Sequence, residues 1–246
     1  MIPLAACLVT AASLSWSQFV AAVWTPQARA AYYLTFGAAA IASVISTFLG
    51  FVIAWVLVRY DFPMKRLFDS LVDLPFALPT AVAGLVFATL YVPNGWLGRF
   101  LVPLGIEGAY SRLAIVLVLV FIGFPFVVRT VQPVLESLDK ESEEAATCLG
   151  AGRWQTFRRI LMPALYPALI TGFALAFARS LGEYGSVVFV SGNMPFKTQI
   201  APMLIVAKLE ENNYAEATAI AVVLLTVSFA MLIVINLMEK WSKVDR

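Results

Sequence analysis

Two charged residues, Arg179 and Glu183, lie inside an otherwise apolar stretch of the sequence. A charge at the centre of a membrane-spanning helix costs about 2.5 to 3.5 kcal/mol on insertion scales, so each of the two needs a physical reason to be there. Because they are four residues apart, they share one face of a helix and can pair. Two readings are open: a mutually neutralising pair that fixes one helix to a neighbour, or an arginine that adds positive potential to an anion path.

Small residues accompany this charged pair. Gly182 and Gly185 flank Glu183 and would loosen the helix beside it. Loosened backbone near the middle of a membrane can expose amide N–H donors to an oxyanion. The candidate anion path therefore consists of Arg179, Ser180, Gly182, Glu183 and Gly185.

The other reactive residue types exclude several kinds of site. The sequence has no His and only two Cys, Cys7 and Cys148. It therefore has too few ligands of the usual types for a zinc site and too few cysteines for a disulfide scaffold. It contains no G-x-x-x-x-G-K-S/T phosphate loop, so nucleotide chemistry must lie elsewhere. An intramembrane hydrolase would need paired carboxylates, a serine with a base, or metal ligands within the spans. We therefore expect a protein that is not an enzyme and binds no cofactor.

A second group of residues forms the polar segment Glu136 to Pro163, ESLDKESEEAATCLGAGRWQTFRRILMP, between two apolar stretches. Asp139 can cap a helix whose first turns are rich in glutamate, including Glu144, and carboxylates there favour the positive end of the helix dipole. Gly150 is then a natural left-handed stop.

A second short helix is predicted from Arg153 to Met162, closed by Pro163. The segment would then be a helix-turn-helix elbow at the membrane surface. Ala145 and Ala146 keep one face small enough to enter a groove on another protein. Apolar contact would come from the larger side chains nearby: Leu149, Trp154 and Phe157. The alternative is a solvated linker with helical propensity.

The composition indicates the medium in which these residues work. Hydrophobic residues make up 61% of the chain and charged residues 13%, against about 45 to 50% and about 25% in soluble proteins. The mean hydropathy is +0.86. This is the composition of an integral membrane protein, and the net charge of +2 is too small to suggest binding to nucleic acid.

Five apolar stretches are long enough to cross a bilayer, which takes about 20 residues. They are Tyr33 to Val58, Leu71 to Val92, Leu113 to Leu135, Ala164 to Val190 and Ala217 to Met238. Ser15 to Arg29 is interpreted as an external connection. The connections 92–112 and 191–216 are too long and too rich in Gly and Pro to be simple hairpins, so we expect them to fold over the outer mouth.

Two features inside these spans have structural interpretations. Pro75 and Pro79 should kink the second span. Arg129 lies close enough to the end of the third span to extend its guanidinium to the cytoplasmic surface. Asp73 is expected near Lys65 or Arg66 at the same interface.

The basic residues predict the orientation. If the polar segment is cytoplasmic, that side holds ten of them, the other side holds five, and Arg129 and Arg179 lie within spans. This distribution agrees with the positive-inside rule and makes the carboxyl terminus cytoplasmic. The cytoplasmic ten are Arg59, Lys65, Arg66, Lys140, Arg153, Arg158, Arg159, Lys240, Lys243 and Arg246. The outer five are Arg29, Arg99, Arg112, Lys197 and Lys208.

The polar segment resembles the EAA loop of binding-protein-dependent ABC importer permeases. That pattern is E-A-A, three residues, G, nine residues, then I-x-L-P. Here Glu144, Ala145 and Ala146 are followed after three residues by Gly150, and after nine more by Ile160 to Pro163, with Met162 in place of Leu. Four segments together resemble the T-type permease subunit of sulfate/thiosulfate importers: DLPFALPTAVAGL (Asp73 to Leu85), PFVVRTVQPVLE (Pro125 to Glu136), EEAATCLGAGRWQTFRRILMPAL (Glu143 to Leu165) and ARSLGEYGSVVFVSGN (Ala178 to Asn193).

The resemblance implies an all-α polytopic membrane protein with the type I ABC importer permease fold. It implies a single transmembrane domain over residues 1–246, with a core at about 33–238 and a coupling loop at 136–163. Similar permeases carry a complete first helix where Ile2 to Leu14 stands, and this stretch is too short to be one. We therefore expect five clear spans preceded by a truncated first helix.

The resemblance also implies partners. A cytoplasmic ABC ATPase dimer would bind ATP and Mg and would dock on the loop through Glu144, Ala145, Ala146, Leu149, Gly150, Ile160 and Pro163. A second permease subunit, W-type or another copy of this chain, would complete the translocation path in the bacterial inner membrane. A periplasmic binding protein would deliver sulfate or thiosulfate. ATP binding would draw the two loops together and rotate the attached spans.

Two alternatives stay open. A molybdate or tungstate importer permease shares the segments around Pro75 and Gly182. A channel or secondary transporter would also be polytopic, but it should work without an ATPase and would have no need for the elbow.

Overall fold

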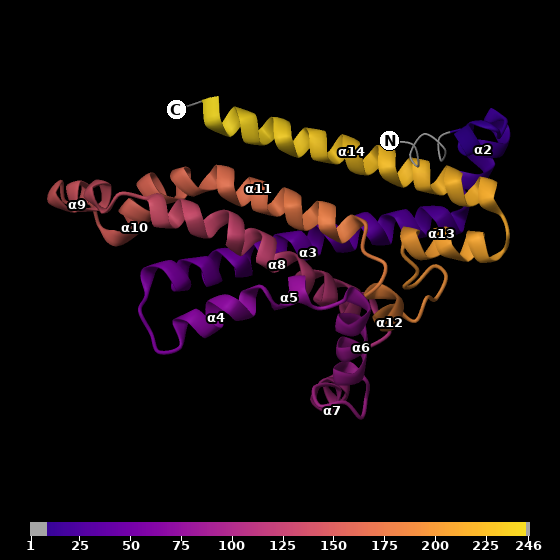
Figure 1. Cartoon of the computed structure of the whole chain (residues 1–246), viewed down its shortest axis with the longest axis horizontal. Coiled ribbons are helices and arrows are strands. Elements are labelled where there is room, and N and C mark those ends of the chain that lie inside the picture. Colours follow the sequence, from indigo (N-terminus) through magenta and orange to yellow (C-terminus); the bar gives the residue numbers. More distant parts are fainter. Residues whose placement is uncertain (1–8, 245–246) are drawn as a thin grey trace.

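The computed structural model describes residues 9–244, and the side chains of residues 9–237. This part of the chain is helical and contains no strand (Figure 1). Its α-helices are α2 (Trp16–Val23), α3 (Pro26–Arg59), α4 (Lys65–Val72), α5 (Leu74–Ala77), α6 (Thr80–Tyr91), α7 (Gly98–Leu101), α8 (Arg112–Ser137), α9 (Lys140–Cys148), α10 (Arg153–Thr156), α11 (Met162–Leu181), α12 (Val187–Ser191), α13 (Ala201–Glu210) and α14 (Tyr214–Val244). A 3-10 turn covers Val102–Leu104 and a π-helical turn covers Phe157–Leu161.

Four helical stretches within the described residues are long and apolar enough to cross a membrane: Pro26–Arg59, Arg112–Ser137, Arg153–Leu181 and Tyr214–Leu237. The first, second and fourth contain predicted spans, so those three predictions are confirmed. α3, α8 and α14 run in one direction and α11 runs in the other (Figure 1). The elbow region around α9 and the carboxyl end of α14 therefore lie toward the same end of the molecule.

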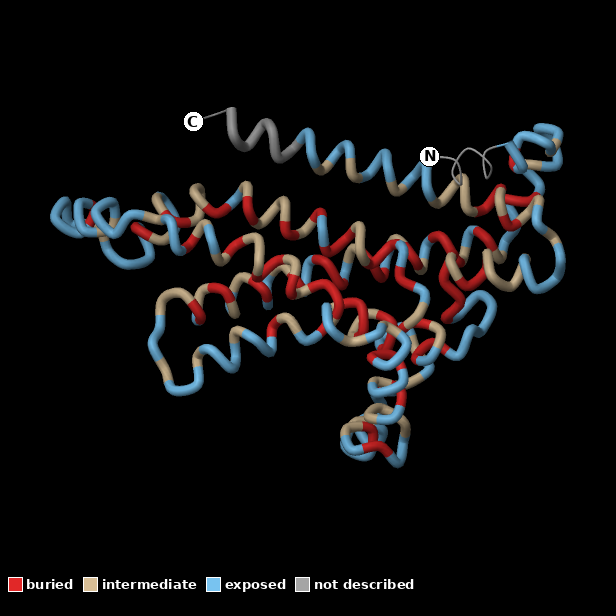
Figure 2. The backbone as a smooth tube through the Cα atoms, in the orientation of Figure 1, coloured by how far each residue is buried: buried red, intermediate tan, exposed pale blue. Residues whose placement is uncertain are grey.

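Small residues let α3, α8 and α11 pack closely. A side chain at Gly50 of α3 would come within 2.6 Å of the Val127 Cβ atom, and one at Gly172 of α11 within 3.1 Å of the Val127 Cα atom. Val127 is fully buried between the two glycines. Close backbone approach of this kind replaces the hydrophobic driving force that helices lack in lipid. Figure 2 shows the resulting arrangement, with buried backbone concentrated among these three helices.

The predicted span Leu71 to Val92 is not one helix but three, α4, α5 and α6. The chain is extended at Leu78 (φ −82°, ψ 132°) and at Pro79 (φ −56°, ψ 132°). A residue before proline is driven out of the helical region, so Pro79 breaks the span rather than merely kinking it. α6 then turns away from the line of α4 and α5 (Figure 1).

The predicted span Ala164 to Val190 also stops early, because α11 ends at Leu181 and α12 begins at Val187. The Glu183 carboxylate accepts hydrogen bonds from the backbone N–H and the hydroxyl of Ser186, both at 2.9 Å. These bonds satisfy backbone that would otherwise be unpaired at a helix break.

The connections contain more structure than predicted. Ser15 to Arg29 is not an irregular connection, because Ser15 and Gln18 form a capping box on α2 and α3 already begins at Pro26. The connection 92–112 holds α7 and the 3-10 turn, and 191–216 holds α13. The expectation of a truncated first helix concerns a stretch of which residues 1–8 lie outside the described part of the chain.

The contact between α6 and α12 gives a test of the fold. A side chain at Gly84 would meet the Ser186 carbonyl oxygen at 2.3 Å and its Cα atom at 2.7 Å. We expect Gly84→Val to destabilise the protein by about 1–3 kcal/mol, because backbone atoms cannot move aside as a flexible side chain can. Thermal unfolding in detergent measures this.

The matched control is Gly37→Ala on α3, where nothing lies within 4 Å of an added Cβ atom. This variant should be as stable as the parent or slightly more so, since alanine favours helix. Equal melting temperatures for the two variants would contradict the tight α6–α12 contact.

Candidate functional site

The elbow is built by a glycine at the end of α9. Gly150 has a φ of +82°, a left-handed conformation that favours glycine. Its N–H donates to the Thr147 carbonyl at 3.0 Å, and the Ala151 N–H donates to the Ala146 carbonyl at 2.9 Å. These two bonds are the pair that defines a Schellman motif. The left-handed stop predicted from the sequence is therefore confirmed.

Aromatic and charged contacts hold the elbow against the end of α3. Arg59 Nη2 lies 2.6 Å from Glu143 Oε1, and the same guanidinium stands 5.2 Å from the centre of the Trp55 ring. Phe157 packs edge-on against Trp55 with ring centres 5.6 Å apart and stacks on Trp154 at 5.4 Å. The elbow is therefore in direct side-chain contact with the end of α3.

The outer surface of the elbow presents a mixed face to its surroundings. Leu149 is 88% exposed, and Glu144 and Ala145 are exposed beside it. Ala146 is buried against the chain itself, so the prediction that both alanines face a partner is wrong for that residue. The alanine instead lets α9 lie close to its own protein.

Two further predictions about the polar segment need correction. The Asp139 side chain makes no capping hydrogen bond, and the first N–H groups of α9 lie at an exposed surface where water can serve them. Pro163 does not close a separate helix. The helix starting at Arg153 passes through the π-helical turn and continues into α11, and this wider turn precedes the proline, whose ring would clash in a regular α-helix interior.

The continuous helix makes one rod of Arg153–Leu181. Ile160 is half-buried within its π-helical turn, and Pro163 follows at the start of α11. The rod connects the elbow directly to Arg179, near its far end. The two groups of residues singled out in the sequence are thus joined by one continuous helix.

The two breaks in the predicted spans meet each other. An added Cβ atom at Gly185 would lie 2.4 Å from Thr80 Oγ1, and one at Gly84 would lie 2.3 Å from the Ser186 carbonyl oxygen. The interrupted backbone at 78–80 therefore lies against the interrupted backbone at 182–186. Irregular backbone at membrane depth is tolerated only where protein covers it or where it lines a water-filled cavity.

Arg179 lies at this junction with much of its guanidinium free. Its Nη1 atom bonds to Glu183 Oε2 at 2.5 Å, so the predicted pair forms. Glu183 is 2% exposed at its side chain and Arg179 is 34% exposed. Within the described residues this is the one partner of the guanidinium. Ser180 Oγ is buried there without a hydrogen-bond partner, and open space surrounds Gly182.

Arg129 has a role that the sequence reasoning missed. Its five N–H donors all find acceptors: Asp73 at 2.7 and 2.8 Å, the Asp69 side chain and carbonyl at 2.6 and 2.8 Å, and Gln132 at 2.7 Å. The guanidinium thus joins α8 to α4 and to the residue before α5, in a cluster that is partly exposed. Asp73 pairs with Arg129 and not with Lys65 or Arg66.

The signal for this Arg129 cluster was present in the sequence. Asp69 and Asp73 are four residues apart and share one face of the chain before the break, so they can bind a single guanidinium together. The described residues hold no group of three or more His, Cys, Asp or Glu side chains that could bind a metal.

Comparisons with known proteins agree on one family. Residues 46–243 match the family described as binding-protein-dependent transport system inner membrane component. The chain belongs to this family. It is 51% identical over 243 residues to the sulfate transport system permease protein CysT of Synechocystis sp., covering 99% of this chain and 85% of that protein. It is 46% identical over 239 residues to CysT of Escherichia coli, covering 97% and 86%.

Solved structures confirm the fold of this family member. A bacterial ABC transporter involved in the import of alginate has a chain with a TM-score of 0.75 at 18% identity, covering 92% of this chain and 84% of that chain. The inward-facing MetNI methionine ABC transporter gives 0.64 at 14% identity, covering 85% and 93%. The protein thus has the type I ABC importer permease fold and is a multi-pass membrane transport subunit.

The Arg129 cluster provides a test of how the permease holds its broken span. Arg129→Met should lower stability by about 1–3 kcal/mol, because hydrogen bonds to charged groups are lost and two carboxylates are left facing each other. The stability of Arg129→Lys should lie between that of Arg129→Met and that of the parent, since an ammonium has three donors and no planar fork. Thermal unfolding of the purified permease measures both.

Arg66→Met is the control for the loss of charge, because Arg66 is exposed on α4 and has no ion pair among the described residues. A loss of stability as large as that of Arg129→Met would argue against the cluster.

Proposed function

We propose that this chain is the permease subunit of an ATP-driven sulfate/thiosulfate importer, that its elbow docks on a cytoplasmic ATPase dimer, and that the junction of its two helix breaks contacts the anion. The incompletely bonded Arg179 carries the proposal. A charge at membrane depth is costly, and this one keeps donors without a protein partner beside an unpaired hydroxyl and interrupted backbone. An oxyanion would satisfy these donors.

The relatives support the choice of anion. The sulfate permeases from Synechocystis and Escherichia coli align with nearly the whole chain, including both breaks and the elbow. Within this proposal, sulfate binds to the Arg179 guanidinium, the Ser180 hydroxyl and amide groups near Gly182. Glu183 holds Arg179 in place, and the pair is neutral overall, so the anion would be bound by the guanidinium donors that Glu183 leaves unused together with the neutral hydroxyl and amide donors.

Coupling follows from the rod Arg153–Leu181. When the ATPase dimer closes on ATP and Mg, it draws the two docked elbows together. Because the elbow is continuous with α11 and is tied to α3 through Arg59 and Glu143, both spans tilt with it. The tilt changes the contact between the two breaks and opens the path toward the periplasmic binding protein. This is a shift between two packings driven by a partner's ligand.

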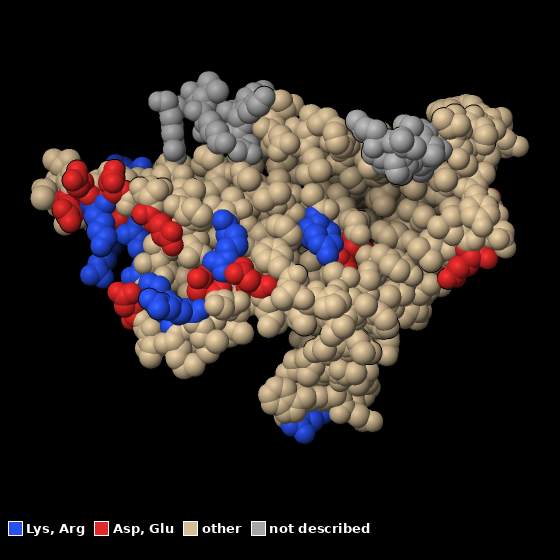
Figure 3. Space-filling model, viewed as in Figure 1, with Lys and Arg blue, Asp and Glu red and all other residues tan. Residues whose placement is uncertain are grey.

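The charge distribution supports a cytoplasmic elbow and a cytoplasmic carboxyl terminus. On the face shown in Figure 3, Lys and Arg residues gather mainly at the end of the molecule that carries α9 and α10, together with acidic residues, and fewer charged groups lie in the middle. An excess of Lys and Arg marks the cytoplasmic side. A second permease subunit, W-type or another copy, would complete the path.

The anion contact is tested by neutralising the charged pair. Arg179→Met with Glu183→Gln should fold, because the amide oxygen of glutamine can still accept from Ser186. Labelled sulfate uptake should fall at least about tenfold, the equivalent of one lost charge-assisted hydrogen bond. Uptake is measured in bacterial cells that lack their own sulfate importer and carry this chain with its genomic neighbours, with thiosulfate and molybdate as competitors.

A matched control neutralises a pair on the outer connection, Lys208→Met with Glu211→Gln, where the hydrogen bond to Glu211 raises the pKa of Lys208. Its uptake should match the parent. Full sulfate uptake by the variant Arg179→Met with Glu183→Gln would show that the pair has a purely structural role. Strong suppression of uptake by molybdate would identify the protein as a molybdate permease instead.

Docking of the elbow is tested by Glu144→Lys. The substitution replaces an exposed carboxylate with a cation. The variant should still insert in the membrane. The purified transporter should then retain less ATPase, or its ATPase should hydrolyse ATP without transport of the anion. Glu141→Lys, the same charge change on the same helix, is the control. Coupled uptake at the parent rate in Glu144→Lys would contradict docking through Glu144, and uptake that needs no ATPase at all would favour an ATPase-independent transporter.

A further inference from the structure

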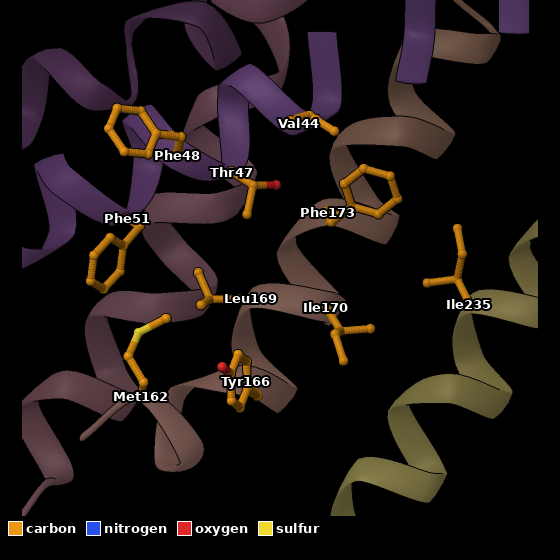
Figure 4. A pocket seen from close by; sticks show the side chains of 10 residues that line it. All are labelled: Val44, Thr47, Phe48, Phe51, Met162, Tyr166, Leu169, Ile170, Phe173 and Ile235. Atoms are coloured by element: carbon orange, nitrogen blue, oxygen red, sulfur yellow. The ribbon is translucent and has the colours of Figure 1, made fainter. Parts of the chain in front are cut away.

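An apolar groove lies between α3, α11 and α14 on the flank of the bundle (Figure 4). Its volume is about 450 Å³. Among the lining side chains, Val44 is 60% exposed, Phe48 67% and Tyr166 51%. The full lining is Val44, Thr47, Phe48, Phe51, Met162, Tyr166, Leu169, Ile170, Phe173 and Ile235. Ile235 faces Ile170 and Phe173 across the opening between α14 and α11 in Figure 4.

The groove offers almost no polar group to water. The Thr47 hydroxyl is already used, because it donates to the Ser43 carbonyl at 2.7 Å. Tyr166 supplies the other hydroxyl, toward the elbow end of the groove. A cavity of this composition in a membrane-spanning bundle excludes water and fits hydrocarbon.

Two arginines without ion partners stand beyond one end of this groove. The α11 residues that line it follow helical spacing from Met162 through Tyr166 to Phe173. Arg158 precedes Met162 by four residues and Arg159 precedes it by three, so both lie about one turn before the first α11 residue of the lining. Both are exposed on the π-helical turn, and neither has an ion pair among the described residues.

We infer that this groove binds an anionic phospholipid, with an acyl chain along the apolar lining and the headgroup phosphate on Arg158 and Arg159. The ligand must be apolar along its length and negative at one end, and a lipid of the same leaflet meets both conditions. Arginine suits phosphate because its donors form a planar fork. Basic positions beside membrane helices on the cytoplasmic side favour anionic lipids.

The position of the site gives it a consequence for transport. The headgroup would be bound within the π-helical turn that joins the elbow to α11, and the acyl chain would separate α11 from the carboxyl-terminal half of α14. α14 is otherwise little buried there, with Phe229 65% and Val234 56% exposed. A bound anionic lipid would thus stabilise the elbow end of the rod. The inference requires the elbow end to face the cytoplasm, as proposed above, but not that the anion is sulfate.

The experiment is native mass spectrometry of the assembled transporter, titrated with phosphatidylglycerol or phosphatidylcholine. The parent should retain phosphatidylglycerol more tightly than phosphatidylcholine. Arg158→Gln with Arg159→Gln should weaken phosphatidylglycerol binding about thirtyfold, about fivefold for each basic residue, and should leave phosphatidylcholine little changed. Val44→Trp, which fills the groove, should weaken both lipids.

Two controls match these variants. Arg66→Gln with Lys140→Gln removes two exposed positive charges away from the groove. Leu225→Trp adds the same ring to an exposed position of α14 that does not line it. Both controls should bind phosphatidylglycerol within twofold of the parent.

Equal phosphatidylglycerol binding by the double arginine variant and its control would overturn the proposal. So would undiminished lipid binding in Val44→Trp accompanied by loss of the second permease subunit, which would make the groove a subunit interface. Because the readout is lipid retention, these outcomes are distinguishable from a failure of sulfate transport.

Discussion

The structure depends on how interrupted backbone is paired and covered at membrane depth. Lipid offers no hydrogen bonds, so a helix that stops inside the bilayer must find partners in the protein. Here two interrupted segments lie against each other, and hydrogen bonds within one of them satisfy its own backbone. Gly84 and Gly185 allow the breaks to touch, and the Glu183 carboxylate takes up the Ser186 N–H. A buried carboxylate in turn requires a cation, which Arg179 supplies. The hydrogen bond between the Ser186 N–H and Glu183 thus comes with a partly unbonded guanidinium in the bundle, that of Arg179.

The two intramembrane arginines differ in how completely they are bonded. Arg129 uses all five of its donors to fix α8 against the chain before the first break. Arg179 has one protein partner among the described residues and is one-third exposed. A fully bonded guanidinium fixes the geometry, while an incompletely bonded one can exchange partners with a ligand. The first therefore positions the junction at which the second would contact an anion.

The rod Arg153–Leu181 connects this junction to the elbow. The π-helical turn admits the proline without ending the helix. The contacts of Arg59, Trp55 and Phe157 extend the same connection to α3, so the surface loop contacts two spans.

The sequence by itself determined the membrane class, three complete spans, the left-handed stop at Gly150 and the pairing of Arg179 with Glu183, because hydropathy, glycine and four-residue spacing act locally. Only the tertiary structure decided that the spans around Pro79 and Gly182 break and meet. It also decided that Ala146 faces inward, that the helix continues past Pro163 after a π-helical turn, and that Arg129 binds Asp69 and Asp73. The meeting of the two breaks and the Arg129 cluster depend on neighbours far away in the chain, and local pattern carries no information on which neighbour that is.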